Sequence, residues 1–254
     1  MIFTPWAKDT WEPSLNLIAE RGYLIPAIGD QYVACAERLA DSIRQYHPAA
    51  NITIATVDQL PHGDLGGFAN DWQMFEISPY RQTVKLEADM ICASPIDHWW
   101  TLFERKDLVI STGCRTYYDT PGQSRVYRKI FDHNRLPDVY NAITYWRRSK
   151  TAQEFFDLVR EIFINWDQYK TLLKFPDELA TTDVVYAMAA VIMGEEQVTL
   201  PAGLGPTIVH MKKNMIATVS ENWNDDLVWE IDPFRINTVA QWGLVHYHVK
   251  HWTP

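Results

Sequence analysis

The chain has 254 residues, of which 47% are hydrophobic, and this is enough apolar material for one large domain or two small ones. Its 32 acidic and 23 basic residues give a net charge of −9, which disfavours nonspecific attraction to nucleic acid or to an anionic membrane. Cys35, Cys92 and Cys114 lack a C-x-x-C spacing, and no segment has the roughly 18 apolar residues of a membrane span. We therefore expect a cytoplasmic protein without a disulfide framework or a zinc ribbon.

The first predicted elements form a β-α-β unit. Residues 22–29 predict a strand and a turn, and Pro26 favours either an edge strand or an irregular strand. Asp30 is expected to cap a helix whose apolar residues recur at helical spacing as far as Tyr46. Residues 51–57 then predict a second strand.

The segment 78–91 has the most informative pattern. Its apolar and charged residues alternate with the period of a strand: Val84, Leu86, Ala88 and Met90 against Lys85, Glu87 and Asp89. We expect a buried apolar face and an exposed charged face, with Glu87 and Asp89 at the carboxyl end, where open α/β sheets bind ligands. Such a carboxylate pair can hold Mg²⁺ or Mn²⁺ together with a substrate diphosphate. The alternative is a half-exposed strand whose charges only face water.

The rest of the chain continues the α/β pattern. By hydrophobic period and turn residues we predict a loop at 62–70, a helix at 98–106, a buried strand at 107–113, a basic loop at 114–137, a strand at 138–146, an amphipathic helix at 152–166, a helix from Thr181 or Thr182 to Gly194, and strands at 198–200 and 207–211. Asp183 falls in the first turn of the helix that ends at Gly194, where an acid favours the helix dipole.

Two features near the end of the chain have open interpretations. His246 and His248 alternate around Tyr247, so a strand would put both on one face and offer a metal or phosphate contact, but surface histidines are the favoured interpretation. The 11 tryptophans and 12 tyrosines are expected mainly to fill the core, and the remainder would suit a sugar-stacking surface.

The order of several motifs resembles the family 8, glycogenin-like glycosyltransferases of the GT-A fold. Residues 78–90 resemble the segment that ends in the D-x-D metal motif of that family, with Glu87 in place of its first aspartate. Asn141-Ala142-Ile143 resembles the N-x-G strand, Thr182-Asp183 the start of the D-Q helix, and residues 208–212 the late histidine motif. The sequence also resembles phage-encoded glycosyltransferases, for which the compartment would be the host cytoplasm.

The resemblance implies a GT-A-like, Rossmann-type mixed sheet flanked by helices. It implies a single domain over 1–254, with a nucleotide-sugar half at about 22–115 and an acceptor-side half at about 116–254. The reaction would be sugar transfer from a UDP-sugar with retention of anomeric configuration. The roles implied are metal ligands at Glu87, Asp89 and His210, catalytic residues at Asp89 and Asp183, and donor-binding residues at Tyr32, Asp58, Arg81, Lys85, Asn141 and Lys212.

Two other functions remain open from the sequence. A nucleotidyl or phosphoryl transferase would also use paired carboxylates with a metal, although a G-x-x-x-x-G-K motif is absent from the sequence. A non-catalytic carbohydrate-binding protein with a degenerate transferase fold is the other alternative. The acceptor can be a glycan, a protein, a small molecule or, for a phage-encoded enzyme, a modified DNA base.

Overall fold

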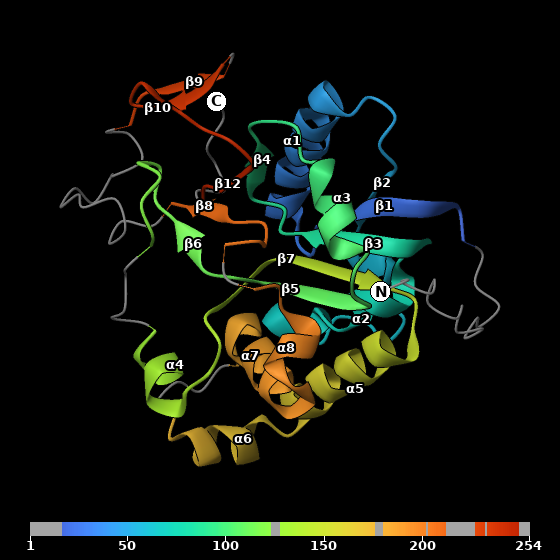
Figure 1. Ribbon diagram of the computed structural model, residues 1–254. Helices are drawn as coiled ribbons and strands as arrows, with labels where there is room; N and C mark the ends of the chain where they lie inside the picture. The colour runs from blue at the N-terminus through green and yellow to red at the C-terminus, as the bar shows by residue number, and fades with distance from the viewer. Residues whose placement is uncertain are drawn as a thin grey trace, which may run out of the picture.

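The computed structural model describes residues 17–122, 128–175, 180–201, 203–211, 227–231 and 233–248. Over these residues the chain is a mixed α/β structure in which helices cover both faces of a central sheet (Figure 1). No helix within these ranges is long and apolar enough to cross a lipid bilayer.

The central sheet has the strand order β2-β1-β3-β7-β5. Its strands are β1 (Ala19–Pro26), β2 (Ile52–Ala55), β3 (Tyr80–Leu86), β5 (Leu108–Thr112) and β7 (Val139–Arg147). β1 is parallel to β2 and β3, whereas β7 is antiparallel to β3 and β5. The carboxyl ends of four strands therefore meet the amino end of β7 at one edge of the sheet.

A second sheet, of order β4-β12-β8-β6, joins segments that are far apart in the sequence. Its strands are β4 (Met90–Cys92), β6 (Cys114–Arg115), β8 (Ile208–His210) and β12 (Leu244–His246). β12 is antiparallel to β4 and parallel to β8, so His246 is paired with Met90 on one side and with His210 on the other. A small antiparallel sheet of β9 (Trp229–Ile231), β10 (Phe234–Ile236) and β11 (Val239–Ala240) lies at the periphery (Figure 1).

The helices divide between the two faces of the central sheet. On one side lie α1 (Asp30–Tyr46) and α3 (His98–Phe103) (Figure 1). On the other lie α2 (Gln73–Ile77), α4 (Lys129–Asn134), α5 (Lys150–Ile164), α6 (Trp166–Leu173), α7 (Thr182–Met193) and α8 (Glu195–Val198) (Figure 1). Two short 3-10 helices, Val57–Gln59 and Gly67–Asn70, lie between β2 and α2.

Each face of the central sheet has its own hydrophobic core. Neighbouring residues of β7 point to opposite faces, so Tyr145 stacks on Phe103 of α3 while Trp146 packs edge-on against Phe156 of α5. Every residue of β7 except the last is buried, as expected for a strand with covered faces. The residues from Val184 to Ala190 of α7 are also all buried, which fixes the start of this helix against the sheet edge.

Several predicted elements are confirmed. α1 runs from Asp30 to Tyr46, β2 lies within the predicted strand 51–57, α5 is the predicted amphipathic helix, and Asp183 lies in the first turn of α7. The edge-strand interpretation of Pro26 is wrong, because β1 lies between β2 and β3 and Pro26 is its last residue. Asp30 is not the cap either: Gly29, with φ of 104°, is the N-cap and Asp30 belongs to the first turn.

The expected exposed face of segment 84–90 is wrong. Lys85 is 1% exposed and Asp89 is 4% exposed, because distant segments supply a partner for each. β3 ends at Leu86, and Glu87 to Asp89 form the connection to β4. Lys85 and Asp89 are therefore buried, whereas the side chain of Glu87 is 33% exposed.

Two other predictions about local structure are corrected. Segment 114–137 is not simply a basic loop, because it contains β6 and α4, and its Arg115 and Arg128 are buried; residues 123–127 lie outside the described part. Val198 ends α8 and does not begin a strand. The three cysteines are buried thiols.

Candidate active site

A cavity of about 700 Å³ opens at the carboxyl edge of the central sheet. Its walls come from the end of β1, the start of α1, the β3–β4 connection, the start of β7, the start of α7, and the two strands β8 and β12. The four-stranded sheet stands beside the edge at which the parallel strands of the central sheet end. Segments from the first and the last parts of the described chain therefore share one site.

The acid pair lies in the connection between β3 and β4, and backbone hydrogen bonds hold both ends of it. The amide of Glu87 donates to the carbonyl of Ala142 at 3.1 Å, and the amide of Tyr247 donates to the carbonyl of Asp89 at 3.1 Å. The second bond fixes the neighbouring His246 beside the acids. Its Nε2 lies 3.1 Å from Asp89 Oδ1 and 3.2 Å from Glu87 Oε2.

The acid pair has a perturbed protonation equilibrium. Desolvation in the cavity raises the pKa of Glu87 to about 7, the imidazole of His246 opposes this rise, and the neighbouring carboxylate of Asp89 adds to it. Two close carboxylates that both ionise in this cavity need a positive partner.

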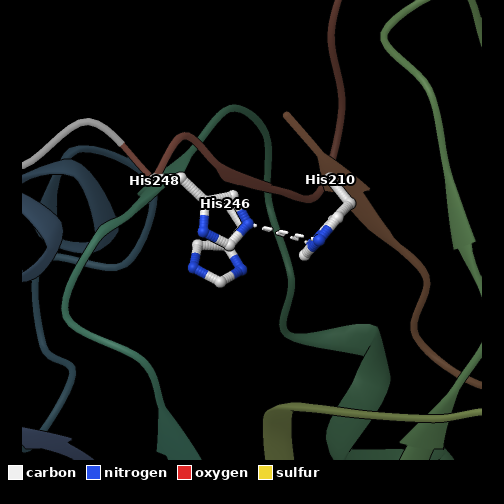
Figure 2. A group of neighbouring side chains, drawn as sticks. All are labelled: His210, His246 and His248. Carbon is white, nitrogen blue, oxygen red and sulfur yellow. Dashed lines mark hydrogen bonds between the residues drawn. The ribbon is translucent and has the colours of Figure 1, made fainter. Parts of the chain in front are cut away.

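Three imidazoles face the cavity next to the acids. His210 is the last residue of β8 and His246 is the last residue of β12, and the two are paired in register. His248 follows two residues later with a left-handed φ of 59°, which returns its ring toward His246. The His246 and His248 ring centroids are 3.7 Å apart, and His248 Nε2 lies 3.2 Å from His210 Nε2 (Figure 2).

Two groups of side chains in the described part have the spacing of metal ligands. One is Glu87, Asp89 and His246, and the other is His210, His246 and His248; within each group the ligand atoms lie within 4.8 Å of one another. Asp89 and His210 fall in different groups, and His246 belongs to both. Carboxylate oxygens with imidazole nitrogens form a donor set that suits a divalent transition-metal ion.

A polar network lines the wall of the cavity formed by β3, β7 and α7. Lys85 Nζ lies 2.5 Å from Asp71 Oδ1, and Asn141 Nδ2 donates to Asp71 Oδ2 at 3.1 Å. The hydroxyl of Tyr186 also donates to Asp71, and burial raises the pKa of Tyr186 well above its ordinary value. Lys85 is therefore held by a carboxylate of this chain, with its charge balanced inside the wall.

Asp183 is held in place from two sides. It accepts a hydrogen bond from the backbone amide of Asn141 at 2.8 Å and one from Arg128 Nη1 at 3.1 Å. Arg128 is fully buried, donates to Asp138 at 2.7 Å, and stacks with its guanidinium 4.0 Å from the ring centroid of Tyr140. The first turn of α7 thus presents an oriented carboxylate to the cavity.

The structure brings most of the sequence-predicted residues to one cavity. The residues that line it are Tyr32, Lys85, Glu87, Asp89, Asn141, Asp183 and His210. Asp58 does not reach it: it is exposed in the first 3-10 helix and accepts a hydrogen bond from Thr56. Arg81 is the second residue of β3, at the end of that strand away from Glu87, and its Nε pairs with Glu20 at 3.2 Å. Lys212 lies outside the described residues.

Asp71 and Arg128 line the cavity but were not candidates from the sequence. His246 and His248 also line it; they were considered as a metal or phosphate contact, but surface positions were the favoured interpretation. The alternation of His246 and His248 was a usable signal, but their place near the end of the chain favoured surface positions. Arg128 stood among other basic residues with no apolar period, and nothing local distinguishes Asp71.

No protein-family model matches the chain, and no curated protein matches it in sequence. Solved structures do match. The galactosyltransferase LgtC, in complex with donor and acceptor sugar analogs, is 12% identical with a TM-score of 0.51, over 89% of this chain and 87% of that one. Mouse xyloside xylosyltransferase 1, in its apo form, is 11% identical with a TM-score of 0.50, over 93% of this chain and 100% of that one. The chain is thus structurally similar to family 8 glycosyltransferases and has a mixed α/β, GT-A-like fold.

Proposed function

We propose that the chain is a metal-dependent glycosyltransferase that moves a sugar from a UDP-sugar donor to an acceptor. The sequence does not identify the acceptor. The observation that carries the proposal is the meeting of Glu87, Asp89 and three histidines in a cavity at the carboxyl edge of the central sheet. Open α/β sheets bind their ligands at this edge. The fold supports the same reading, because it is shared with sugar-transferring enzymes.

The metal ion would be Mn²⁺ or Mg²⁺, held by Asp89 and Glu87 with His246 and His210 beside them. When bound, such an ion neutralises the charge that develops on a leaving diphosphate. Glu87 must then be ionised, although desolvation raises its pKa to about 7 in the absence of a cation.

Two helix amino termini also favour a phosphorylated ligand. Gly29 and Tyr32 at the start of α1, and Thr181 and Thr182 at the start of α7, all line the cavity. Unpaired backbone N–H groups and the helix dipole make such ends favourable for anions. We assign the diphosphate to the space between these helix ends and the acid pair.

Asp183 is our candidate for the group that orients the sugar hydroxyls, and we keep it with Asp89 as a catalytic candidate. It receives one hydrogen bond on each carboxylate oxygen, from Asn141 and from Arg128. A carboxylate has about four lone-pair sites, so about two remain for hydroxyl groups of a ligand.

We also propose that residues 1–254 act as a single domain. β4 and β12, from the predicted donor and acceptor halves, are adjacent strands of one sheet, and β7 lies between β3 and β5. Strands from the two predicted halves are therefore hydrogen-bonded neighbours in both sheets.

The function is tested by calorimetry and by turnover. UDP is titrated into the protein with and without Mn²⁺. Release of the nucleoside diphosphate is followed with UDP-glucose, UDP-galactose, UDP-N-acetylglucosamine and GDP-mannose as substrates. Nucleoside triphosphates are assayed in parallel, because a nucleotidyl transferase would turn them over. We expect Mn²⁺-dependent UDP binding and turnover of a nucleotide sugar only. Asp89→Asn should lower turnover on the order of 100-fold or more, and Asp157→Asn, the same change on the exposed face of α5, should have no effect. Full turnover by Asp89→Asn would refute the assignment.

A further inference from the structure

The three histidines of the site form one compact nitrogen-rich face. Rings of His246 and His248 lie nearly parallel at an interplanar angle of 30°, and His210 stands edge-on to both at 74° and 82° (Figure 2). All three line the cavity, and they come from two adjacent strands and the residues that follow. This arrangement involves more imidazoles than the single late histidine of the sequence resemblance.

The backbone holds these rings together independently of any ligand. β8 and β12 pair in parallel, and the amide of Met211 donates to the carbonyl of His246 at 2.9 Å. His248 is held back toward the strand by its left-handed conformation, which side chains other than glycine seldom adopt. A strained backbone position beside a cavity is typical of a functional site.

The observed spacings are also those of ligands around one ion. Two donors about 2.1 Å from an ion and at right angles lie about 3.0 Å apart, and opposite donors lie about 4.2 Å apart. His248 Nε2 is 3.2 Å from His210 Nε2, close to the first of these distances. The ligand atoms of the three imidazoles all lie within 4.8 Å of one another, so a movement of at most about 0.6 Å brings the widest pair to the distance of opposite donors.

We propose that His210, His246 and His248 bind one borderline transition-metal ion such as Co²⁺, Zn²⁺ or Mn²⁺ in preference to Mg²⁺ or Ca²⁺. Magnesium and calcium take oxygen ligands, whereas imidazole suits the later first-row metals. The inference rests on the proposed function, because it names the metal class of the same site. It adds His248 to the residues that hold the ion, and it prefers a transition-metal ion to Mg²⁺.

The test titrates the untagged, metal-stripped full chain with Co²⁺ alone and, separately, with Mg²⁺ alone. Calorimetry should give one Co²⁺ per chain, bound at least about 100-fold more tightly than Mg²⁺. Proton NMR of the cobalt protein should show paramagnetically shifted imidazole N–H signals, one for each coordinated ring, and we expect three. This count is a property of the wild type and does not depend on any variant folding.

Variants identify the rings. His248→Asn keeps a residue that tolerates the left-handed conformation and removes the imidazole, so the fold should persist, as the metal-free melting temperature checks. It should weaken Co²⁺ binding at least about 10-fold and remove one shifted signal, since even the loss of a hydrogen-bond partner of a ligand costs 10–100-fold. His246→Asn should behave in the same way, and His133→Ala, on the exposed surface of α4, should bind Co²⁺ as the wild type does.

Equal affinities for Co²⁺ and Mg²⁺, fewer than three shifted imidazole signals, or unchanged Co²⁺ affinity in His248→Asn would overturn the inference. The proposed function fails separately. If a UDP-sugar is turned over with Mg²⁺ and His248→Asn does not change the rate, the proposed function holds and the three-imidazole site does not. If the three histidines bind Co²⁺ but the protein binds neither UDP nor a nucleotide sugar, the metal site holds and the proposed function does not.

Discussion

His246 Nε2 lies 3.1 Å from Asp89 Oδ1, although the two residues are far apart in the sequence. The contact exists because β12 runs antiparallel to β4 and the amide of Tyr247 binds the carbonyl of Asp89. The last strand of the described chain therefore completes a site that begins at the end of β3. The imidazole also counters, in the absence of a metal ion, the repulsion between Glu87 and Asp89.

Replacing His246 should have two effects. In His246→Ala, the acids lose their imidazole, so the free energy of unfolding of the metal-free protein should fall by about 1–3 kcal/mol, and most of the rise in melting temperature caused by Mn²⁺ should disappear. His62→Ala is the matched control, because His62 and Glu76 form a His–Glu contact of the same 3.2 Å length with side chains 41% and 40% exposed. The control should change stability by less than about 1 kcal/mol. Equal losses in the two variants would show that His246 contributes no more than a surface contact.

Stability should depend on pH through Glu87. Its pKa rises from an ordinary value of 4.5 to about 7 in the folded protein, so the native state binds the proton more tightly than the unfolded state. Protonated Glu87 therefore adds to the free energy of unfolding. This contribution is fully present below pH 4.5 and is lost as the pH rises through about 7. Urea unfolding of the metal-free protein from pH 5 to pH 8 should show this loss, and Glu87→Gln should lack it. Added Mn²⁺ should stabilise the wild type more at pH 8 than at pH 6, because a ligand must be deprotonated. Parallel pH profiles for wild type and Glu87→Gln would contradict this.

Lys85 and Asp71 form an ion pair inside the wall of the cavity, with side chains 1% and 14% exposed. Lys85→Met should destabilise the protein by about 3–5 kcal/mol, because the carboxylate of Asp71 stays buried without its cation. The double variant with Asp71→Asn should be less destabilised than the sum of the two single changes. Lys150→Met, which breaks the exposed pair with Glu154, is the control and should cost no more than about 0.5 kcal/mol. The free energies of unfolding are measured with denaturant. If the loss in the double variant equals the sum of the losses in the two single variants, Lys85 and Asp71 do not stabilise each other.

Asp183 should affect turnover without affecting the nucleotide. Asp183→Asn keeps an oxygen for the amide of Asn141 but loses the charge, so we expect kcat for the nucleotide sugar to fall about 100-fold and the Kd of UDP to stay within about twofold. Asp167→Asn, also in the first turn of a helix, with a side chain 90% exposed, is the control and should leave both constants unchanged. A parallel loss of UDP affinity in Asp183→Asn would place this side chain against the nucleotide instead of the sugar.

The sequence predicted what depends on local pattern. The helical periods of α1 and α5 and the acid in the first turn of α7 are local signals, and the structure confirms these elements. The alternation correctly predicted β3 as far as Leu86, but the strand ends there, before Glu87 and Asp89, and the expected exposed charged face is wrong. Burial of a charge depends on its partner, and Asp71 and His246 come from segments that sequence spacing cannot connect.

The same limit applies to the histidines and to Arg128. A strand was expected to carry both His246 and His248, but β12 ends at His246 and His248 follows it with a left-handed φ. The pairing of β12 between β4 and β8 is what brings this segment to the site. Arg128 is fully buried because Asp138, Asp183 and the ring of Tyr140 surround its guanidinium, and none of these contacts has a local sequence signature. Asp58 and Arg81, which the resemblance implied as donor-binding residues, lie outside the cavity lining.

The sharing of one ion between Asp89 and His246 is tested most directly by diffraction from a crystal soaked with Mn²⁺ and UDP. We predict an anomalous Mn²⁺ peak within about 2.3 Å of ligand atoms of both residues, with the diphosphate of UDP on the same ion. UDP bound in the cavity without such a peak, or a peak that contacts neither residue, would contradict the account.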